Sequence, residues 1–305
     1  MISRDDIEAA ARRIAGHVRR TPVIEIAPRL WLKLELLQHT GTFKPRGMFN
    51  RVLSNDVPPE GLIVASGGNA GLATAYVGQQ LGHKVEVFVP VTTPTVKVQR
   101  LEEYGAVVVK TGEVYADALE ASEERRIETG ALQVHAYDQP EVVTGQGTLG
   151  RELAEQVPSA DTVVVSVGGG GLIAGIGAWY AGTRRVIAVE SRGCPTMHDA
   201  RAAGRPVEVA ATGVAKDSLG AACIGDIAWS HLQAGHIGDC VLVDDADILS
   251  ARRWLWQELR IVTEPGTAAA VAALRTGAYR TAADETVVVV LCGANTDPAD
   301  LAAEL

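Results

Sequence analysis

Cysteine is scarce in this sequence, with four among 305 residues. Their spacing is wide and irregular, which indicates neither a disulfide framework nor a zinc site. The seven histidines likewise form no cluster with the spacing of metal ligands. The cysteines are Cys194, Cys223, Cys240 and Cys292.

Long apolar runs and an excess of positive charge are also missing. No apolar run approaches membrane-spanning length, and Met1 to Arg20 has the pattern of a charged amphipathic helix opening at Ser3, not of a signal peptide. We therefore expect a cytoplasmic protein. The net charge of −9 argues against nucleic acids and anionic membranes as partners.

Strand and helix patterns alternate along the chain without repeats or an obvious linker. This alternation predicts an α/β fold of open parallel sheets flanked by helices, and 305 residues are enough for two lobes with the site in the cleft between them. The expected strands are Leu30 to Leu37, Leu62 to Ser66, Lys84 to Pro90, Ala106 to Lys110, Leu132 to Tyr137, Thr162 to Val167, Arg185 to Glu190, Cys240 to Val243 and Thr286 to Cys292. Expected helices include Asn69 to Leu81, Pro94 to Tyr104, Glu113 to Glu128 and Leu172 to Tyr180.

Lys44 lies where a strand pattern gives way to a helix pattern. Gly41 interrupts the strand, Thr42 has the character of a helix cap, and Pro45 suits the first turn. A lone lysine at a helix start is usually solvated. Pointed into a cleft, it is a candidate for Schiff-base formation.

Two glycine-containing loops could bind an anion. In the run Ser66 to Gly71, a strand leads through small residues into a helix, whose first amides lack internal partners. Gly168 to Gly171 follow a β-branched strand and open another helix, and glycine lets the backbone approach a phosphate closely.

The second loop also fits a dinucleotide fingerprint. Gly169, Gly171 and Ala174 have the required spacing, and Glu190 ends the next strand. A nicotinamide-dependent oxidoreductase is therefore an alternative, although it gives no role to Lys44 or to the loop at Ser66.

In this order the three loops resemble the fold-type II enzymes of pyridoxal 5′-phosphate, specifically the serine and threonine dehydratases, with the L-serine dehydratase branch most similar. That family has the tryptophan synthase β-like fold. The late segment Cys292-Gly293-Ala294-Asn295 also matches, as do Gly145 to Thr148 and Glu264 to Gly266. The resemblance extends from Thr21 to Asn295. It implies a small lobe of residues 36–137 and a large cofactor-binding lobe of residues 1–35 and 138–305, and it suggests a homodimer.

The resemblance assigns roles to individual residues. Lys44 would hold the cofactor and then take the substrate Cα proton, Phe43 would pack on the pyridine ring, and Asn69 would bond the ring's phenolic oxygen. The substrate carboxylate would bind Ser66 and the amides of Gly67, Gly68, Asn69 and Ala70. The cofactor phosphate would bind Gly168, Gly169, Gly170 and Gly171.

Cys292 takes the position that faces the pyridine nitrogen in this family. A thiol is a weak hydrogen-bonding group, so it would leave that nitrogen essentially neutral, which suits β-elimination. Gly67 stands where the family's racemases carry a serine, on the ring face opposite the lysine.

Related enzymes bind a cation at the carboxylate that ends the strand after the phosphate loop. Here Thr196 offers only a neutral oxygen where magnesium-dependent branches have an aspartate, so we expect a monovalent ion, potassium. The ligands would be Glu190, Thr196 and backbone carbonyls near Cys194, Leu219 and Ala221.

The leading hypothesis is a dehydratase that converts a β-hydroxy amino acid, L-serine or L-threonine, into pyruvate or 2-oxobutyrate and ammonia. Pro45 and Met48 depart from the usual residues and could reshape the pocket. The alternatives are a serine racemase, a β-replacing synthase, a threo-3-hydroxyaspartate dehydratase, the oxidoreductase above and a cofactor-binding protein without turnover.

Overall fold

The computed structural model describes residues 1–304, with side chains for residues 1–301, and contains two sheets. The six-stranded sheet has the order β1-β2-β10-β7-β8-β9, in which β1 is antiparallel to β2 and every other pair is parallel. Strands β7 and β10 are buried along their whole length, as expected for central strands of a parallel sheet covered on both faces. The strands are β1 (Val23–Ala27), β2 (Leu30–Lys33), β7 (Thr162–Ser166), β8 (Arg185–Ser191), β9 (Cys240–Val243) and β10 (Val287–Val290).

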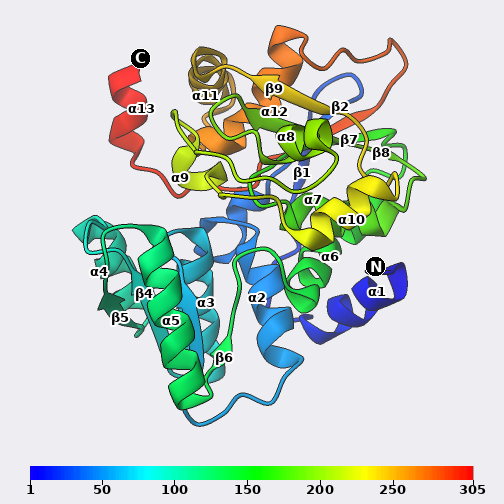
Figure 1. Ribbon diagram of the computed structural model, residues 1–305. Coiled ribbons are helices and arrows are strands. Elements are labelled where there is room, and N and C mark those ends of the chain that lie inside the picture. Colours follow the sequence, from blue (N-terminus) through cyan, green and yellow to red (C-terminus); the bar gives the residue numbers. More distant parts are fainter. Residues whose placement is uncertain (305) are drawn as a thin grey trace.

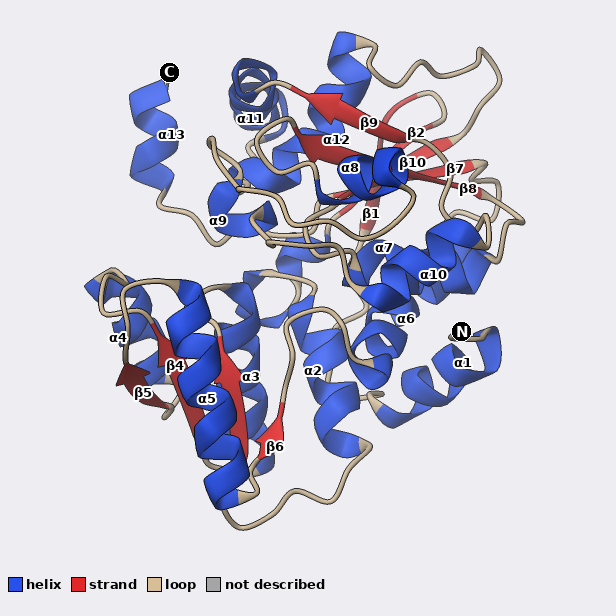
Figure 2. Ribbon diagram, in the orientation of Figure 1, coloured by secondary structure: helices blue, strands red, loops and turns tan. Residues whose placement is uncertain are grey.

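The second sheet is built from an inner part of the chain and lies in the lower half of the molecule in Figures 1 and 2. Its order is β5-β4-β3-β6, and all pairs are parallel. The six-stranded sheet takes strands from both ends of the chain, while the exact lobe boundaries at residues 36 and 137 stay a prediction. The strands are β3 (Leu62–Ala65), β4 (Val85–Val89), β5 (Val107–Lys110) and β6 (Leu132–Gln133).

Helices cover both sheets (Figure 2). The helix that begins with Lys44, α2, packs on α6 through glycines: a side chain at Gly145 would meet the Arg46 carbonyl oxygen at 2.5 Å. The helices are α1 (Arg4–Arg13), α2 (Lys44–Leu53), α3 (Asn69–Leu81), α4 (Thr95–Glu103), α5 (Tyr115–Thr129), α6 (Pro140–Gln156), α7 (Gly171–Tyr180), α8 (Thr196–Ala203), α9 (Lys216–Leu219), α10 (Asp226–Gln233), α11 (Asp245–Leu259), α12 (Pro265–Thr276) and α13 (Pro298–Glu304), with 3₁₀ turns η1 (Glu35–Leu37) and η2 (His39–Gly41).

The α/β class and the parallel sheets are confirmed, whereas several predicted boundaries are wrong. The strand expected to reach Leu37 ends at Lys33, because Glu35 turns inward to bond a buried arginine. The first helix ends at Arg13, and Gly16 follows it with a φ of +81°. Strand β6 stops at Gln133.

The prediction that Thr42 caps the helix at Lys44 is also wrong. Phe43 occupies the cap position of α2 without a side-chain hydrogen bond, while the Thr42 hydroxyl accepts a 3.4 Å bond from the Lys44 amide. Pro45 does lie in the first turn. Among the described helices none is both long and apolar enough to cross a membrane.

Candidate active site

Lys44 lies at the first position of α2. Its Nζ donates a 2.7 Å hydrogen bond to the carbonyl oxygen of Ala136 and lies 4.9 Å from the centre of the Phe43 ring. Desolvation lowers the pKa of this amine to about 8, against the opposing influence of Cys292 and Glu264. A neutral amine is therefore accessible near physiological pH.

A buried ionic network fixes the first turns of α2. Arg46 donates to Glu35 at 2.5 and 3.0 Å and to Glu152 at 3.0 Å, and Lys33 donates to the other Glu152 oxygen at 2.5 Å. These contacts join β2, α2 and α6 behind Lys44. Removing one partner would leave an unpaired buried charge, so the network constrains where Lys44 can lie.

Asn69, Glu264 and Asn295 form a chain of hydrogen bonds across the cleft. The Asn69 amide nitrogen donates to both Glu264 oxygens at 3.0 and 3.1 Å, and its oxygen accepts a 2.8 Å bond from Asn295. Burial raises the pKa of Glu264 to about 7. The sequence singled out Asn69 here but gave Glu264 no role.

The loop from Ser66 leads directly into α3. Gly68 occupies the cap position and no side chain caps the helix, so its first amides are free to bind an anion. The Ser66 hydroxyl accepts a 3.3 Å bond from the Gly68 amide. A side chain at Gly71 would overlap the Ser66 carbonyl oxygen, which explains the small residue there.

The four glycines form the turn from β7 into α7. Gly170 has a φ of +87°, and α7 also lacks a side-chain cap. A side chain at Gly169 would overlap the Tyr137 ring, and one at Gly168 would lie 3.0 Å from the Leu219 backbone. Because the turn has no side chains, a bound anion can come close to its backbone amides.

Cys292 connects these segments from the end of β10. Its carbonyl oxygen accepts a 3.1 Å bond from the Phe43 amide, and its Sγ lies 3.2 Å from the Thr267 hydroxyl. Burial raises the pKa of the thiol to about 12, so the thiol is neutral. Cys292 is therefore a buried, weak hydrogen-bonding group.

The residues expected to hold a cation lie beneath the glycine turn. The Thr196 hydroxyl oxygen lies 2.9 Å from a Glu190 oxygen and 2.6 Å from the Gly168 carbonyl oxygen, and its one hydrogen can be donated to either. Glu190 also accepts bonds from the amides of Met197 and His198, at the start of α8. No cluster of three or more histidine, cysteine or acidic side chains suited to a metal occurs among the described residues.

The remaining expected ligands lie beside this carboxylate and beside the glycine turn. Cys194 is buried in the loop between β8 and α8, where its thiol contacts the Thr212 carbonyl oxygen. Leu219 ends α9 against Gly168, and the Ala221 amide donates to the Leu219 carbonyl oxygen at 2.9 Å. The cation site remains a prediction.

Hydrogen bonds thus connect Lys44 to Ala136, Phe43 to Cys292 and Asn69 to Glu264, and the ring of Tyr137, the residue after Ala136, packs on the glycine turn at Gly169. The sequence analysis missed the contacts of Ala136, Tyr137 and Asn295. The strand pattern before Tyr137 was the available signal, because loops after parallel strands line such clefts.

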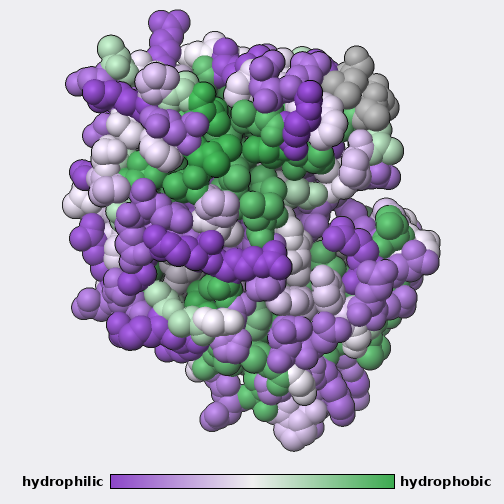
Figure 3. Space-filling view, turned by 180° about the vertical axis from the view of Figure 1, so that it is seen from behind, coloured by the Kyte–Doolittle hydropathy of each residue, from purple (hydrophilic) through white to green (hydrophobic). Residues whose placement is uncertain are grey.

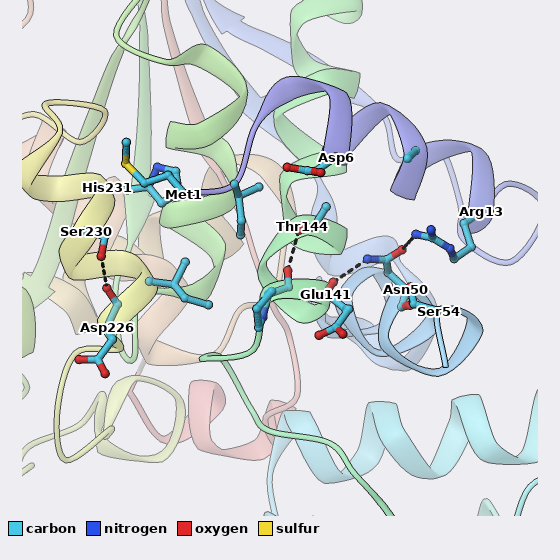
Figure 4. Close-up of a pocket in the computed structure, with 14 residues that line it drawn as sticks. Met1, Asp6, Arg13, Asn50, Ser54, Glu141, Thr144, Asp226, Ser230 and His231 are labelled. Atoms are coloured by element: carbon cyan, nitrogen blue, oxygen red, sulfur yellow. Dashed lines mark hydrogen bonds between the residues drawn. The ribbon is translucent and has the colours of Figure 1, made fainter. Parts of the chain in front are cut away.

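A larger cavity, of about 580 Å³, lies away from this cleft between α1, α2, α6 and α10 (Figure 4). Its labelled side chains include Asp226, Ser230 and His231 on one side and Arg13, Asn50 and Ser54 on the other. None of the predicted site residues lines it. This cavity is therefore separate from the predicted site.

Known proteins resemble this chain over most of its length. Residues 14–293 match the family model described as pyridoxal-phosphate dependent enzyme, and the chain belongs to that family. It is 35% identical to an L-threonine ammonia-lyase of Geobacter sulfurreducens, over 95% of this chain and 75% of that protein. It is also 35% identical to a phenylserine dehydratase of Ralstonia pickettii, over 96% of this chain and 93% of that protein.

Solved structures share the fold of this chain. Maize serine racemase superposes with a TM-score of 0.91 at 29% identity, covering 99% of this chain and 96% of that one. The fold-type II architecture is thereby confirmed. The family match favours the phosphate-binding interpretation of the four glycines over the dinucleotide one.

The residues present fit pyridoxal phosphate. The amides of Gly168 to Gly171 form a turn without side chains for the phosphate, and α7 starts there uncapped. With its lowered pKa, the Lys44 amine would suit the cofactor's aldehyde, and the neutral Cys292 thiol would suit the ring nitrogen.

Proposed function

We propose that the protein is a pyridoxal-phosphate-dependent ammonia-lyase that dehydrates a β-hydroxy amino acid, L-serine and/or L-threonine, to pyruvate or 2-oxobutyrate and ammonia. The observation that carries this proposal is the desolvated Lys44 amine, which donates to the Ala136 carbonyl oxygen and whose pKa is lowered to about 8 in an environment that includes Cys292 and Glu264. The relatives named threonine ammonia-lyase and phenylserine dehydratase support the same reaction class.

Each residue has a definite task in this reaction. The bound cofactor supplies an electron sink for the bonds at Cα. The Lys44 amine takes the Cα proton, and the Ser66 hydroxyl with the first amides of α3 hold the substrate carboxylate. Asn69, which Glu264 and Asn295 hold in place, would donate one of its two amide hydrogens to the ring's phenolic oxygen and keep the other on Glu264. Cys292 donates no full proton to the ring nitrogen, because its pKa of about 12 keeps the proton on sulfur.

Racemisation is the second candidate, because the fold is so similar to that of maize serine racemase. A racemase needs a proton donor on each face of Cα. Gly67 has no side chain on the face opposite Lys44, which supports elimination over racemisation.

We further propose a homodimer in the cytoplasm with a potassium ion at Glu190 and Thr196. The space-filling view in Figure 3 shows hydrophobic residues gathered over the upper part of one face, which supports self-association there. Light scattering at several protein concentrations tests the dimer: a monomer mass throughout contradicts it.

The reaction itself is tested in one preparation. We expect the purified protein to carry a yellow cofactor that borohydride fixes on Lys44, as peptide mapping will show, and to release 2-oxo acid from L-serine or L-threonine. The Lys44→Ala variant should lose at least about 10²- to 10⁴-fold of turnover, the range for removing a general base. Residual activity above a tenth of the native level contradicts the role of Lys44.

A further inference from the structure

Residues 135–138 form the connection from β6 of the four-stranded sheet toward α6 (Figure 1). The Ala136 carbonyl oxygen accepts from the Lys44 amine at 2.7 Å. The next residue, Tyr137, lies against the glycine turn, because a side-chain carbon at Gly169 would overlap its ring. One short segment therefore contacts both the amine and the turn that are expected to hold the cofactor.

Two sets of hydrogen bonds determine the shape and place of this segment. The His135 Nδ1 atom accepts from the backbone amides of Tyr137 and Asp138, at 3.3 and 2.9 Å. The Asp138 carboxylate accepts from the backbone amides of Asp226 and Ile227, both at 3.0 Å. His135 thus closes a local turn, whereas Asp138 fastens that turn to the first turn of α10.

The cap of α10 comes from Asp138 and not from the helix itself. Its own cap residue, Gly225, makes no side-chain cap hydrogen bond, although the first amides of a helix lack internal partners. Asp138, 88 positions before Asp226, supplies the acceptor oxygens. The Gly225 amide donates to the Gly169 carbonyl oxygen at 3.1 Å. The start of α10 is therefore bonded both to Asp138 and to the glycine turn.

The fit between Gly225 and Asp138 is close. A side-chain carbon at Gly225 would lie 2.6 Å from the Asp138 Oδ1 atom and 2.7 Å from its carboxyl carbon. The backbone of Gly225 has a φ of −68°, which any residue can adopt. Contact with the carboxylate, and not backbone conformation, therefore favours glycine here, and Gly225→Ala would displace the carboxylate without removing its charge.

We propose that Asp138 is a positioning residue for both parts of the cofactor site. By fastening the segment to α10, it keeps the Ala136 carbonyl oxygen on the Lys44 amine, away from water, and the Tyr137 ring on the glycine turn. The described hydrogen bonds of Asp138 include none to Lys44 or to the glycine turn, so Asp138 acts through its two neighbours.

The first test measures trace acetylation of Lys44 against pH in the cofactor-free protein. It compares the native protein with Asp138→Ala, Asp138→Asn and Asp161→Ala. Asparagine removes the charge but keeps one oxygen that can accept from an α10 amide. Asp161 accepts from the Thr286 amide at 2.9 Å and precedes β7, whereas the glycine turn follows β7. Its variant controls for the loss of a carboxylate that bonds a backbone amide.

We expect the inflection of Lys44 reactivity to rise in Asp138→Ala from about 8 toward the ordinary value of about 10.4, because the displaced segment admits water to the amine. Asp138→Asn should show a smaller rise, and Asp161→Ala none. Loss of a negative charge by itself would lower the inflection. A lowered or unchanged inflection in folded Asp138→Ala overturns the proposal, as does an equal rise in Asp161→Ala.

Cofactor binding gives an independent readout at the glycine turn. Pyridoxal 5′-phosphate and pyridoxal differ only in the phosphate group, so the ratio of their Kd values isolates its contribution. We expect this preference for the phosphate form to fall about 10-fold in Asp138→Ala and in Gly225→Ala, as for one weakened charge-assisted hydrogen bond, and to stay unchanged in Asp161→Ala. An unchanged preference in Gly225→Ala overturns the proposal even if Asp138→Ala fails to fold. Neither readout involves turnover, so failure of the proposed dehydration reaction leaves this test unaffected.

Discussion

The Asn69 side chain donates to both oxygens of Glu264, at 3.0 and 3.1 Å. Asn69 begins α3 and Glu264 precedes α12, so this contact joins the two sides of the cleft next to Lys44. Because the Asn69 oxygen accepts from Asn295, the orientation of the amide is determined from both ends. Glu264 therefore positions the residue that we expect to bond the cofactor ring.

Glu264 should make the stability of the cofactor-free protein depend on pH. Its folded-state pKa is raised to about 7 from 4.5, so the folded protein binds this proton more tightly than the unfolded chain does. The stabilisation that comes from this tighter proton binding is fully present below pH 4.5 and is lost as the pH rises to about 7. We compare the free energy of unfolding of Glu264→Gln with that of the native protein. The difference, variant minus native, should be larger at pH 8 than at pH 5, by at most about 3 kcal/mol.

Urea denaturation of both proteins at the two pH values measures this difference. Gln keeps an oxygen that can accept from Asn69, so the contact itself is retained. An equal offset at pH 5 and pH 8 would show that Glu264 does not titrate in this range.

The Lys44 amine should react as a base at lower pH than ordinary lysines. Its pKa of about 8 means that the neutral form dominates above that pH. In the cofactor-free protein, trace acetylation at Lys44 should increase up to about pH 8 and then level off, whereas lysines with the ordinary pKa of about 10.4 continue to gain reactivity. Peptide mass spectrometry gives both rates from the same samples, and parallel pH profiles would exclude the lowered pKa.

Activity should rise with potassium or ammonium and be indifferent to EDTA. Thr196 supplies a neutral oxygen beside Glu190, which suits a monovalent ion better than magnesium. Glu190→Gln preserves an acceptor for the α8 amides but removes the charge, so the response to potassium should be lost. Inactivation by EDTA with recovery on adding magnesium is the opposite result, and it would exclude the monovalent site.

Gly67→Ser should introduce a slow racemase activity. A side-chain carbon at Gly67 would lie 3.2 Å from the Thr93 methyl carbon and 3.3 Å from a Val89 methyl carbon, so these neighbours must shift by a few tenths of an ångström. The added hydroxyl could then return a proton to the face opposite Lys44. Chiral chromatography after incubation with L-serine detects the product, and Gly68→Ser, where a side chain meets nothing within 4 Å, is the matched control.

The sequence predicted much of the fold because its signals are local. Valine-rich segments such as Val163 to Val165 are buried strands, and α3 spans Asn69–Leu81 as expected. The failures come from tertiary contacts. Leu34 to Leu37 look like a continuation of a strand, but the buried pair of Glu35 with Arg46 requires a turn there.

The site was predictable where one motif carries the chemistry and unpredictable where partners are distant in sequence. Lys44, Asn69 and the glycine turn each stand in a recognisable local pattern. The partner of Asn69, Glu264, is 195 positions away, and the Lys44 amine bonds a carbonyl oxygen 92 positions away. A backbone carbonyl leaves no mark in the sequence, so the strand pattern before Tyr137 indicates that this loop lines the site but not that the Ala136 carbonyl oxygen accepts from Lys44.

Partial turnover of L-serine by the native enzyme tests the central claim most directly. Pyruvate, ammonia and both enantiomers of the remaining serine are measured in the same samples. We predict equal amounts of pyruvate and ammonia and no D-serine, because Lys44 acts from one face of Cα and Gly67 has no side chain on the other. D-serine formed in place of pyruvate would contradict this account and make the protein a racemase.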